Sequence, residues 1–277
     1  MTIREALRQG TRLLEQAGIP AARLNAEVLL AHAAGHDRAW LYAHGDEELI
    51  ELWWIHYGRY LHERLSGKPT QYITKRQEFY GREFLVTPDV LIPRPETEHL
   101  VEAAIEKLAH GAGPVIDVGC GSGAIAISVA LETGAAVIGS DISVAALRVA
   151  DRNRRRWNAQ VQLVASDVLS AFRDGCSAMI LSNPPYVPES NKEVTQREVR
   201  DYEPHIALFG GPDGFDLYRR LIADAARVLR PGGWLLMEIA YNASGRIRDI
   251  LGSSWRDVEI RTDLAGLPRV ALARLSE

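Results

Sequence analysis

Cysteine is scarce in this chain of 277 residues, which contains only Cys120 and Cys176. Two cysteines cannot form the set of bridges that stabilises small secreted proteins, so that class is excluded. The sequence also has no Cys/His pattern with the spacing of a metal site, and we therefore expect no bound metal ion.

Long apolar segments are missing as well. No run approaches the length that spans a membrane, and residues 1–5 lack the apolar core of a secretory signal. Hydrophobic residues make up 47% of the chain and charged residues 25%, the balance of an ordinary globular protein. We expect a cytoplasmic protein with no membrane partner, long enough for one large domain or two smaller ones.

An excess of positive charge is also absent. The chain has 32 Lys and Arg against 36 Asp and Glu, a net charge of −4. This balance argues against a protein whose main role is to bind phosphate backbones. The run Arg-Asn-Arg-Arg-Arg at 152–156 could form a local basic patch, but a solvated helix face is the simpler interpretation. A nucleic-acid partner is therefore not expected.

The first part of the chain has the apolar spacing of helices. The residues at helical spacing are Ile3, Leu7, Leu14, the run 26–30, Leu49, Trp53, Tyr57 and Leu61. Gly18-Ile19-Pro20 interrupts the pattern. The aromatic residues in it are more typical of a bundle core than of a ligand site. We predict a helical domain over residues 1–70 that contributes to docking of a substrate.

Residues 71–95 follow a different pattern. Residues 79–84, Phe-Tyr-Gly-Arg-Glu-Phe, are typical of a short hairpin, and we expect its turn at Gly81-Arg82. This predicts a β-hairpin linker over 71–95, which ends near Pro93-Arg94-Pro95.

Helices and strands alternate over residues 96–277, the third predicted domain. The expected helices are 96–109, 123–132, 144–156, 215–229 and 244–251, and the expected strands are 114–118, 136–140, 161–165, 178–182, 233–239, 256–262 and 268–274. Such alternation predicts an α/β fold, with a mostly parallel seven-stranded sheet covered by helices on both faces. The last two strands have no helix between them and predict an antiparallel edge hairpin.

A glycine-rich loop at 119–123, Gly-Cys-Gly-Ser-Gly, joins a strand to a helix. Glycines allow a tight turn and the close approach of a bound group. The pattern Gly119-x-Gly121-x-x-Ala124 also satisfies the dinucleotide fingerprint, so the glycines alone do not exclude a nicotinamide cofactor. Cys120 lies at a helix start, but no His partners it in sequence, and we interpret it as a packing residue.

Acidic residues favour a cationic cofactor in this loop. Asp117 precedes the first glycine, Asp141 ends the next strand, and Asp167 follows the strand after that. Carboxylates suit a sulfonium group with an ammonium tail better than a pyrophosphate. Asp141 could bind the two ribose hydroxyls and Asp167 an adenine amino group. The alternative is a plain strand–turn–helix joint with Asp141 as a helix N-cap.

The tetrapeptide Asn183-Pro184-Pro185-Tyr186 directly follows the apolar run at 179–181. Asn183 offers an amide oxygen, and the carbonyl of Pro184 is free to accept a hydrogen bond. With the ring of Tyr186, these groups form a rigid cradle for a planar amino or amide nitrogen. A turn stiffened by two prolines is the alternative. Its position at the carboxyl end of a strand favours a functional site, and the glycine-rich loop upstream suggests methyl transfer to such a nitrogen.

These motifs together resemble the HemK/PrmC family, the methyltransferases that modify the glutamine side chain of peptide-chain release factors. The resemblance covers nearly the whole chain. Its anchors are Gln71-Tyr72-Ile73, Glu78-Phe79-Tyr80-Gly81, residues 92–98 (Ile-Pro-Arg-Pro-Glu-Thr-Glu), residues 117–123, Ser182 to Tyr186, Tyr202-Glu203-Pro204 and residues 229–233. Asn-Pro-Pro-Tyr alone is shared with amino-methyltransferases that act on adenine or cytosine in nucleic acid.

The resemblance implies a Rossmann-like class I methyltransferase fold, S-adenosylmethionine as cofactor and release factors as protein substrate. The cofactor residues that it and the motifs imply are Asp117, Val118, Gly119, Cys120, Gly121, Gly123, Asp141, Asp167, Val168 and Asn183. The resemblance assigns the target glutamine amide to residues 183–186 and places Arg94 and Glu96 near the cofactor.

Two alternatives to this function stay open at this point. One is a nucleic-acid amino-methyltransferase, and the other is a non-catalytic adaptor with a degenerate methyltransferase fold.

The long loop 187–213 is a candidate lid or partner surface. Within it, we interpret Glu203 and His205 as structural. The chain departs from the family at Ala240, where Gly is frequent, and at Arg269.

Overall fold

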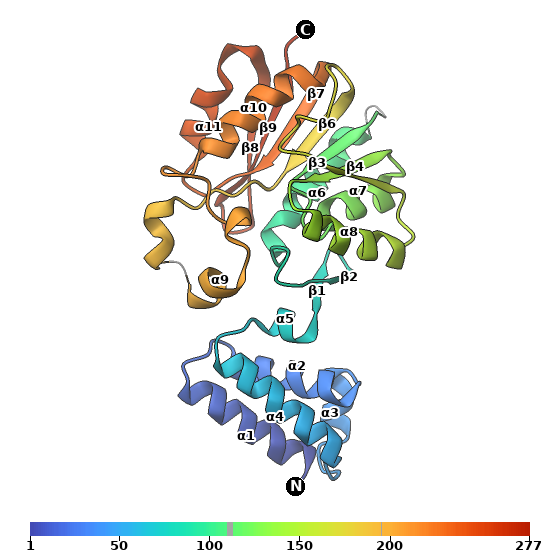
Figure 1. The fold of residues 1–277 in the computed structure, drawn as a ribbon, viewed down its shortest axis with the longest axis vertical. Coiled ribbons are helices and arrows are strands. Elements are labelled where there is room, and N and C mark those ends of the chain that lie inside the picture. The colour runs from blue at the N-terminus through green and yellow to red at the C-terminus, as the bar shows by residue number, and fades with distance from the viewer. Residues whose placement is uncertain (110–112, 195) are drawn as a thin grey trace. The chain divides into compact units, whose positions relative to one another are not determined.

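The computed structural model describes residues 1–109, 113–194 and 196–277. These residues form two compact units (Figure 1). The first unit contains Met1–Arg76 together with Gln196–Tyr202, and the second contains Gln77–Thr195 and Glu203–Glu277. Each unit has a hydrophobic core of its own.

The first unit is helical, as the spacing of its apolar residues predicts. Its helices are α1 Ile3–Gln16, α2 Ala22–Ala34, α3 Arg38–Ala43, α4 Glu51–Leu65, α5 Thr70–Thr74 and α9 Arg197–Tyr202. Thr2 and Glu5 form a capping box that begins α1. Tyr57 is fully buried in the core, where a Cβ at Gly10 would collide with its ring. The aromatic residue at this position is therefore a core residue, as expected.

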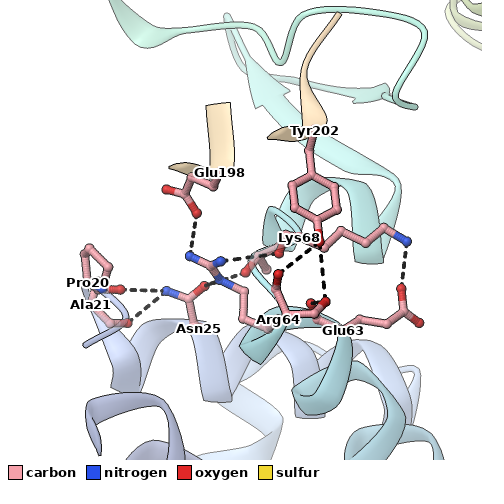
Figure 2. A network of polar contacts seen from close by, with 10 residues as sticks. Pro20, Ala21, Asn25, Glu63, Arg64, Lys68, Glu198 and Tyr202 are labelled. Carbon is pink, nitrogen blue, oxygen red and sulfur yellow. Dashed lines mark hydrogen bonds and ion pairs between the residues drawn. The ribbon is translucent and has the colours of Figure 1, made fainter. Parts of the chain in front are cut away.

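Helix α9 comes from the middle of the loop 187–213, yet it packs within the helical unit (Figure 2). The guanidinium of Arg64 is buried and donates to Glu198 Oε2 at 2.6 Å and to Asn25 Oδ1 at 3.0 Å. The hydroxyl of Tyr202 donates to the carbonyl of Ser66 at 3.1 Å. A segment of the loop is thus held by α4 (Figure 2), a placement that no local pattern predicts. Thr195, in the same loop, lies outside the described residues.

The second unit contains a seven-stranded sheet with the order β5-β4-β3-β6-β7-β9-β8 (Figure 1). The strands are β3 Val115–Val118, β4 Val137–Asp141, β5 Val161–Ala165, β6 Ser177–Ser182, β7 Leu229–Glu238, β8 Trp255–Thr262 and β9 Pro268–Leu275. Pairing is parallel from β5 to β7, and β9 pairs antiparallel with both β7 and β8. The predicted mixed sheet with an antiparallel edge hairpin is confirmed.

Helices cover both faces of the sheet. Successive residues of a strand point to opposite faces, so neighbouring residues of one strand pack against different helices. Val115 and Leu181 pack with α6 Glu98–Leu108 and α7 Ala124–Thr133. Ile116 and Ile180 pack with α10 Asp216–Val228 and α11 Ser244–Leu251. Helix α8 Val144–Arg156 lies beside α7. The doubly covered sheet accounts for the nearly continuous apolar character of its central strands.

The hairpin turn predicted at Gly81-Arg82 is wrong by one residue. The strands β1 Arg76–Phe79 and β2 Arg82–Leu85 leave Tyr80 and Gly81 as the turn, with φ of 50° and 68°. A two-residue hairpin turn with positive φ at both positions matches the twist of the strands. Gly81 is therefore the second turn residue rather than the first.

Two further boundaries differ from the expected ones. The expected strand 233–239 begins at Leu229 and ends at Glu238, because Pro231-Gly232-Gly233 forms an irregularity inside β7 instead of a loop before it. The expected helix 96–109 begins at Glu98, after a 3-10 turn over Pro95–Thr97. Proline at the start of this turn suits its tight geometry. The remaining helices and strands of this unit agree with the prediction to within about two residues.

Asn153 on α8 joins the hairpin to the glycine-rich loop. Its Oδ1 accepts from the backbone N–H of Leu85 at 2.8 Å, and its Nδ2 donates to the carbonyls of Leu85 at 3.0 Å and Ser122 at 2.8 Å. Asn153 is fully buried. The hairpin, α8 and the loop are therefore connected through one side chain.

Replacing Asn153 with alanine removes all three hydrogen bonds and leaves the partly buried backbone of Leu85 and the buried carbonyl of Ser122 without this partner. We expect Asn153→Ala to lower the free energy of unfolding of the second unit by about 2–4 kcal/mol. Urea denaturation, with hydrogen exchange at the Leu85 amide, measures the effect. Arg152→Ala, at an exposed position of the same helix, is the matched control and should change it by less than about 0.5 kcal/mol. Equal effects of the two variants would contradict this role.

Candidate functional site

A cavity of about 340 Å³ lies in the second unit, where the parallel strands β3 to β6 end. In open α/β sheets, ligands bind in the crevice outside the carboxyl ends of the strands, which is lined by the loops that follow them. The predicted site residues that line it are Arg94, Val118, Gly119, Cys120, Gly121, Asp141, Asp167, Val168, Asn183, Pro184 and Pro185. Of the other predicted residues, Glu96, Asp117, Gly123 and Tyr186 are not part of its wall.

The glycine-rich loop forms one side of the cavity. Gly121 has a φ of 53°, and its N–H donates to Asp141 Oδ2 at 2.9 Å. Asp141 Oδ1 accepts from the N–H of Ser143 at 2.8 Å. Burial raises the pKa of Asp141, and these N–H donors partly offset that rise. The carboxylate therefore fixes the loop on one side and faces the cavity on the other.

Asp117 lies behind this loop. It is fully buried, and its Oδ2 accepts from the N–H of Ala126 at 3.1 Å. Its Oδ1 has no partner among the described residues. Burial raises the pKa of Asp117 to about 7. Asp117 thus holds the start of α7, and it stands behind the cavity wall rather than in it.

Asp167 and Val168 form the next part of the wall. Asp167 is exposed and pairs with Arg220 at 2.8 Å. Val168 is buried and has a φ of 50°, a left-handed conformation that β-branched residues rarely adopt. The Ser166 hydroxyl donates to the Val168 carbonyl and accepts from the Ala171 N–H, and these two hydrogen bonds hold the turn. Local backbone strain of this kind is concentrated at functional sites.

Asn183 faces the cavity from the end of β6. Its Nδ2 donates to Thr97 Oγ1 at 3.1 Å, and the Thr97 hydroxyl donates to Glu238 Oε2 at 2.6 Å. Tyr186 donates to Glu238 Oε1 at 3.4 Å, so its polar end is directed at this carboxylate. Glu238 is buried at the end of β7. Four residues from three segments of the chain therefore form one hydrogen-bonded chain beside the cavity.

Thr97 and Glu238 were not among the predicted site residues. The sequence did contain a signal for Glu238, because it is an acid at the end of an apolar strand. Asp117 and Asp141 also lie at or next to the end of a strand. Thr97 follows Arg94 and Glu96 in the motif 92–98, but nothing local distinguishes its hydroxyl. Their role depends on contacts between distant segments of the chain.

Arg94 and Glu96 take different positions. Arg94 lines the cavity and donates to Glu203 Oε1 at 2.5 Å. The side chain of Glu203 is 1% exposed and also accepts from the N–H of Ile92. Glu203 is thus a structural partner of the cavity wall, in line with its interpretation from sequence. Glu96 is half-buried, and its charge contributes to raising the pKa of Glu238.

Solved structures with the same fold are methyltransferases. A methyltransferase from Pyrococcus furiosus has a TM-score of 0.55 at 15% sequence identity, covering 75% of this chain and 94% of that chain. A T. thermophilus 16S rRNA methyltransferase has a TM-score of 0.52 at 21% identity, covering 72% of this chain and 49% of that chain. The fold, with a cavity at the carboxyl edge of its sheet, is that of the class I methyltransferases.

Family models and relatives define the family within that class. The model of the PrmC N-terminal domain matches residues 5–74, and the methyltransferase small domain matches residues 97–207. A release factor glutamine methyltransferase from Koribacter versatilis is 44% identical over 277 residues, covering 99% of both chains. A protein of the same name from Nitratidesulfovibrio vulgaris is 39% identical, and the match covers 99% of this chain and 95% of that protein. The chain belongs to the release factor glutamine methyltransferase family, as its motifs indicate.

The family is one of S-adenosylmethionine-dependent methyltransferases. In the described part of the chain, no helix is both long and apolar enough to cross a membrane. No group of three or more His, Cys, Asp and Glu side chains in the described ranges is arranged to hold a metal ion.

Cys120 lines the cavity but is buried, and burial raises the pKa of its thiol well above the usual range. A thiol in this state is a poor nucleophile. Its sulfur packs close to Gly139, where a Cβ would lie 3.2 Å away. These contacts support the interpretation of Cys120 as a packing residue.

Thiol labelling tests this interpretation. In Cys176→Ser, which leaves Cys120 as the single cysteine, we expect no reaction with a disulfide reagent at neutral pH until the protein is denatured, because the thiol is buried and protonated. Cys120→Ser is the matched control, in which the half-buried Cys176 should react in the native state. Rapid labelling of native Cys176→Ser would show that Cys120 is an exposed thiolate.

Proposed function

We propose that this protein transfers a methyl group from S-adenosylmethionine to the side-chain amide nitrogen of the glutamine in the Gly-Gly-Gln motif of class-one peptide chain release factors. One observation carries the proposal: the corner formed by Asn183 and Pro184 lines the same cavity as the glycine-rich loop and Asp141. The residues that we assign to the nucleotide and to the amide therefore face a common space. Membership of the release factor glutamine methyltransferase family supports the same reaction.

The cavity suits the cofactor in charge and shape. We assign the ribose to Asp141 and the adenine to residues 167–168, all of which line the cavity. Gly119 and Gly121 leave open space where a side chain would stand. When bound, S-adenosylmethionine supplies an electrophilic methyl group on a positively charged sulfur. The carboxylates around the cavity favour such a cation.

Asn183 and Pro184 orient the nucleophile. An amide nitrogen is a weak nucleophile because its lone pair is shared with the carbonyl. Asn183 Oδ1 and the Pro184 carbonyl can accept its two N–H bonds, which fixes the nitrogen and favours a pyramidal geometry. Positioning of this kind contributes about 7–11 kcal/mol to lowering a barrier. The nitrogen loses its proton after the attack, so the step requires no dedicated strong base.

Tyr186 has a supporting role in this proposal. The sequence suggested that its ring forms part of the cradle for the target amide, but its hydroxyl is directed at Glu238 and it stands outside the cavity wall. We assign it to holding Glu238 and the end of the tetrapeptide. Release factors act in the cytoplasm, which is the location that we propose for this protein.

The alternative substrate, an amino group of adenine or cytosine, is less well supported. The relatives that match nearly the full chain are named for release factors. The net charge of −4 also gives no general attraction to a phosphate backbone. We therefore retain the protein substrate.

Mass spectrometry of a purified release factor tests the reaction. After incubation with the protein and labelled cofactor, we expect a gain of one methyl group on the Gly-Gly-Gln glutamine. Asn183→Ala removes one acceptor and should lower kcat by about 100-fold or more, with cofactor affinity within about threefold of the wild type. A methylated nucleic acid with an unmodified release factor would contradict the proposal. Full turnover by Asn183→Ala would contradict the role of Asn183.

Calorimetry tests the role of Asp141 in cofactor binding. Asp141→Ala removes a charged acceptor from the cavity and frees the N–H of Gly121. We expect the Kd of S-adenosylmethionine to rise by about 10- to 100-fold. Asp249→Ala, an exposed acid on α11, is the matched control and should leave the Kd unchanged. Equal affinity of the two variants would remove Asp141 from the binding site.

A further inference from the structure

The chain of hydrogen bonds from Asn183 to Glu238 has a direction. Asn183 Nδ2 donates to Thr97 Oγ1 at 3.1 Å, and Thr97 Oγ1 donates to Glu238 Oε2 at 2.6 Å. A threonine hydroxyl carries a single proton. Because Thr97 gives that proton to Glu238, its oxygen can only accept from Asn183. The amino end of the Asn183 amide must therefore face Thr97.

The opposite end of the amide is then free for the cavity. No described residue donates to Asn183 Oδ1, and Asn183 lines the cavity. The proposed reaction needs this oxygen as an acceptor for an amide N–H of the substrate. An Asn side chain rotated by half a turn would present a donor instead, and that donor would repel the N–H of the substrate. The direction of the chain thus decides whether the site can accept a glutamine.

We propose that Thr97 and Glu238 are positioning residues that fix the orientation of the Asn183 amide, so that its oxygen faces the glutamine of the substrate. The inference rests on the proposed function, since it assigns the acceptor that this reaction uses. Glu238 is not part of the cavity wall, and the hydroxyl of Thr97, which is, is engaged between Asn183 and Glu238, so both act through Asn183. Glu238 provides the direction of the chain because an ionised carboxylate accepts and cannot donate.

The surroundings of Glu238 favour hydrogen bonds whose direction, from Asn183 through Thr97 to Glu238, depends on pH. Thr97 and Tyr186 donate to its two oxygens, Glu96 adds a like charge and Arg269 an opposite one. The hydroxyl of Tyr218 on α10 donates to its backbone carbonyl. Burial raises the pKa of Glu238 to about 7.

Protonation of Glu238 would reverse the chain. A protonated carboxyl can donate to Thr97 Oγ1, and the Thr97 hydroxyl can then donate to Asn183 Oδ1. The amide of Asn183 would turn its amino end toward the cavity. The carboxyl must therefore be ionised for the acceptor to face the substrate, and turnover should increase as the pH rises through the neutral range.

Two variants of Thr97 test the hydroxyl. Thr97→Val keeps the shape but removes the hydroxyl, and we expect kcat to fall by about tenfold or more while the Kd of S-adenosylmethionine stays within about threefold. Thr97→Ser keeps the hydroxyl and should retain most of the turnover. Thermal denaturation shows whether each variant is folded. Equal loss of kcat in the two variants, with both folded, would overturn the proposal.

Glu238→Gln tests the direction of the chain through the pH profile. A glutamine can accept from Thr97 through its oxygen and donate to Tyr186 through its nitrogen, so the direction persists without ionisation. We expect the wild-type kcat to rise between about pH 6 and about pH 8, and the kcat of Glu238→Gln to be flat over that range. The same rise in both proteins would contradict the role of Glu238. This arm remains informative even when Thr97→Val does not fold.

A spectroscopic readout separates this inference from the proposed function. The side-chain amide signal of Asn183, assigned by its loss in Asn183→Ala, can be followed by NMR with selective ¹⁵N-asparagine labelling and no substrate. We expect it to titrate near neutral pH in the wild type and not in Glu238→Gln or Thr97→Val. A signal independent of pH in the wild type would contradict the inference. A titrating signal in a protein that modifies no release factor would support the chain of hydrogen bonds and reject the proposed function.

Discussion

The site depends on the parallel pairing of β3 to β7, which brings the carboxyl ends of these strands to one edge of the sheet. The loop 119–123 follows β3, Asp141 ends β4, Asn183 follows β6 and Glu238 ends β7. Residues far apart in sequence thereby meet without any of them forming local structure with another. An antiparallel arrangement of the same strands would place half of these groups at the opposite edge.

Carboxylates are buried near this edge of the sheet. Asp117 and Glu238 are both enclosed, and burial raises the pKa of each to about 7. Glu238 receives two hydroxyl donors, whereas Asp117 receives one backbone N–H and keeps Oδ1 without a partner among the described residues. Enclosed acids of this kind are unfavourable for stability alone and are typical of functional sites. The apolar faces of the sheet supply the stability that this edge lacks.

Much of the fold was predictable from local patterns. The spacing of Ile3, Leu14 and Tyr57 predicted buried helix faces, and the alternation after residue 96 predicted the sheet. The hairpin turn was misplaced because Tyr80 adopts a left-handed conformation that its residue type does not suggest. In the site, the placement of Tyr186 toward Glu238 was missed because the tetrapeptide fixes the backbone but not the direction in which a ring points. Prediction failed where the outcome depended on a distant partner.

By itself, the sequence determined the features that local chemistry controls. Glycines at 119–123 permit the left-handed turns of the loop, and the prolines at 184–185 stiffen the corner beside Asn183. Only the tertiary structure decided that Thr97 lies between Asn183 and Glu238, and that α9 packs in the helical unit against Arg64. The physical reason is that hydrogen bonds between distant segments leave no periodic or compositional trace. Such contacts exist only when packing within each unit brings their members within reach.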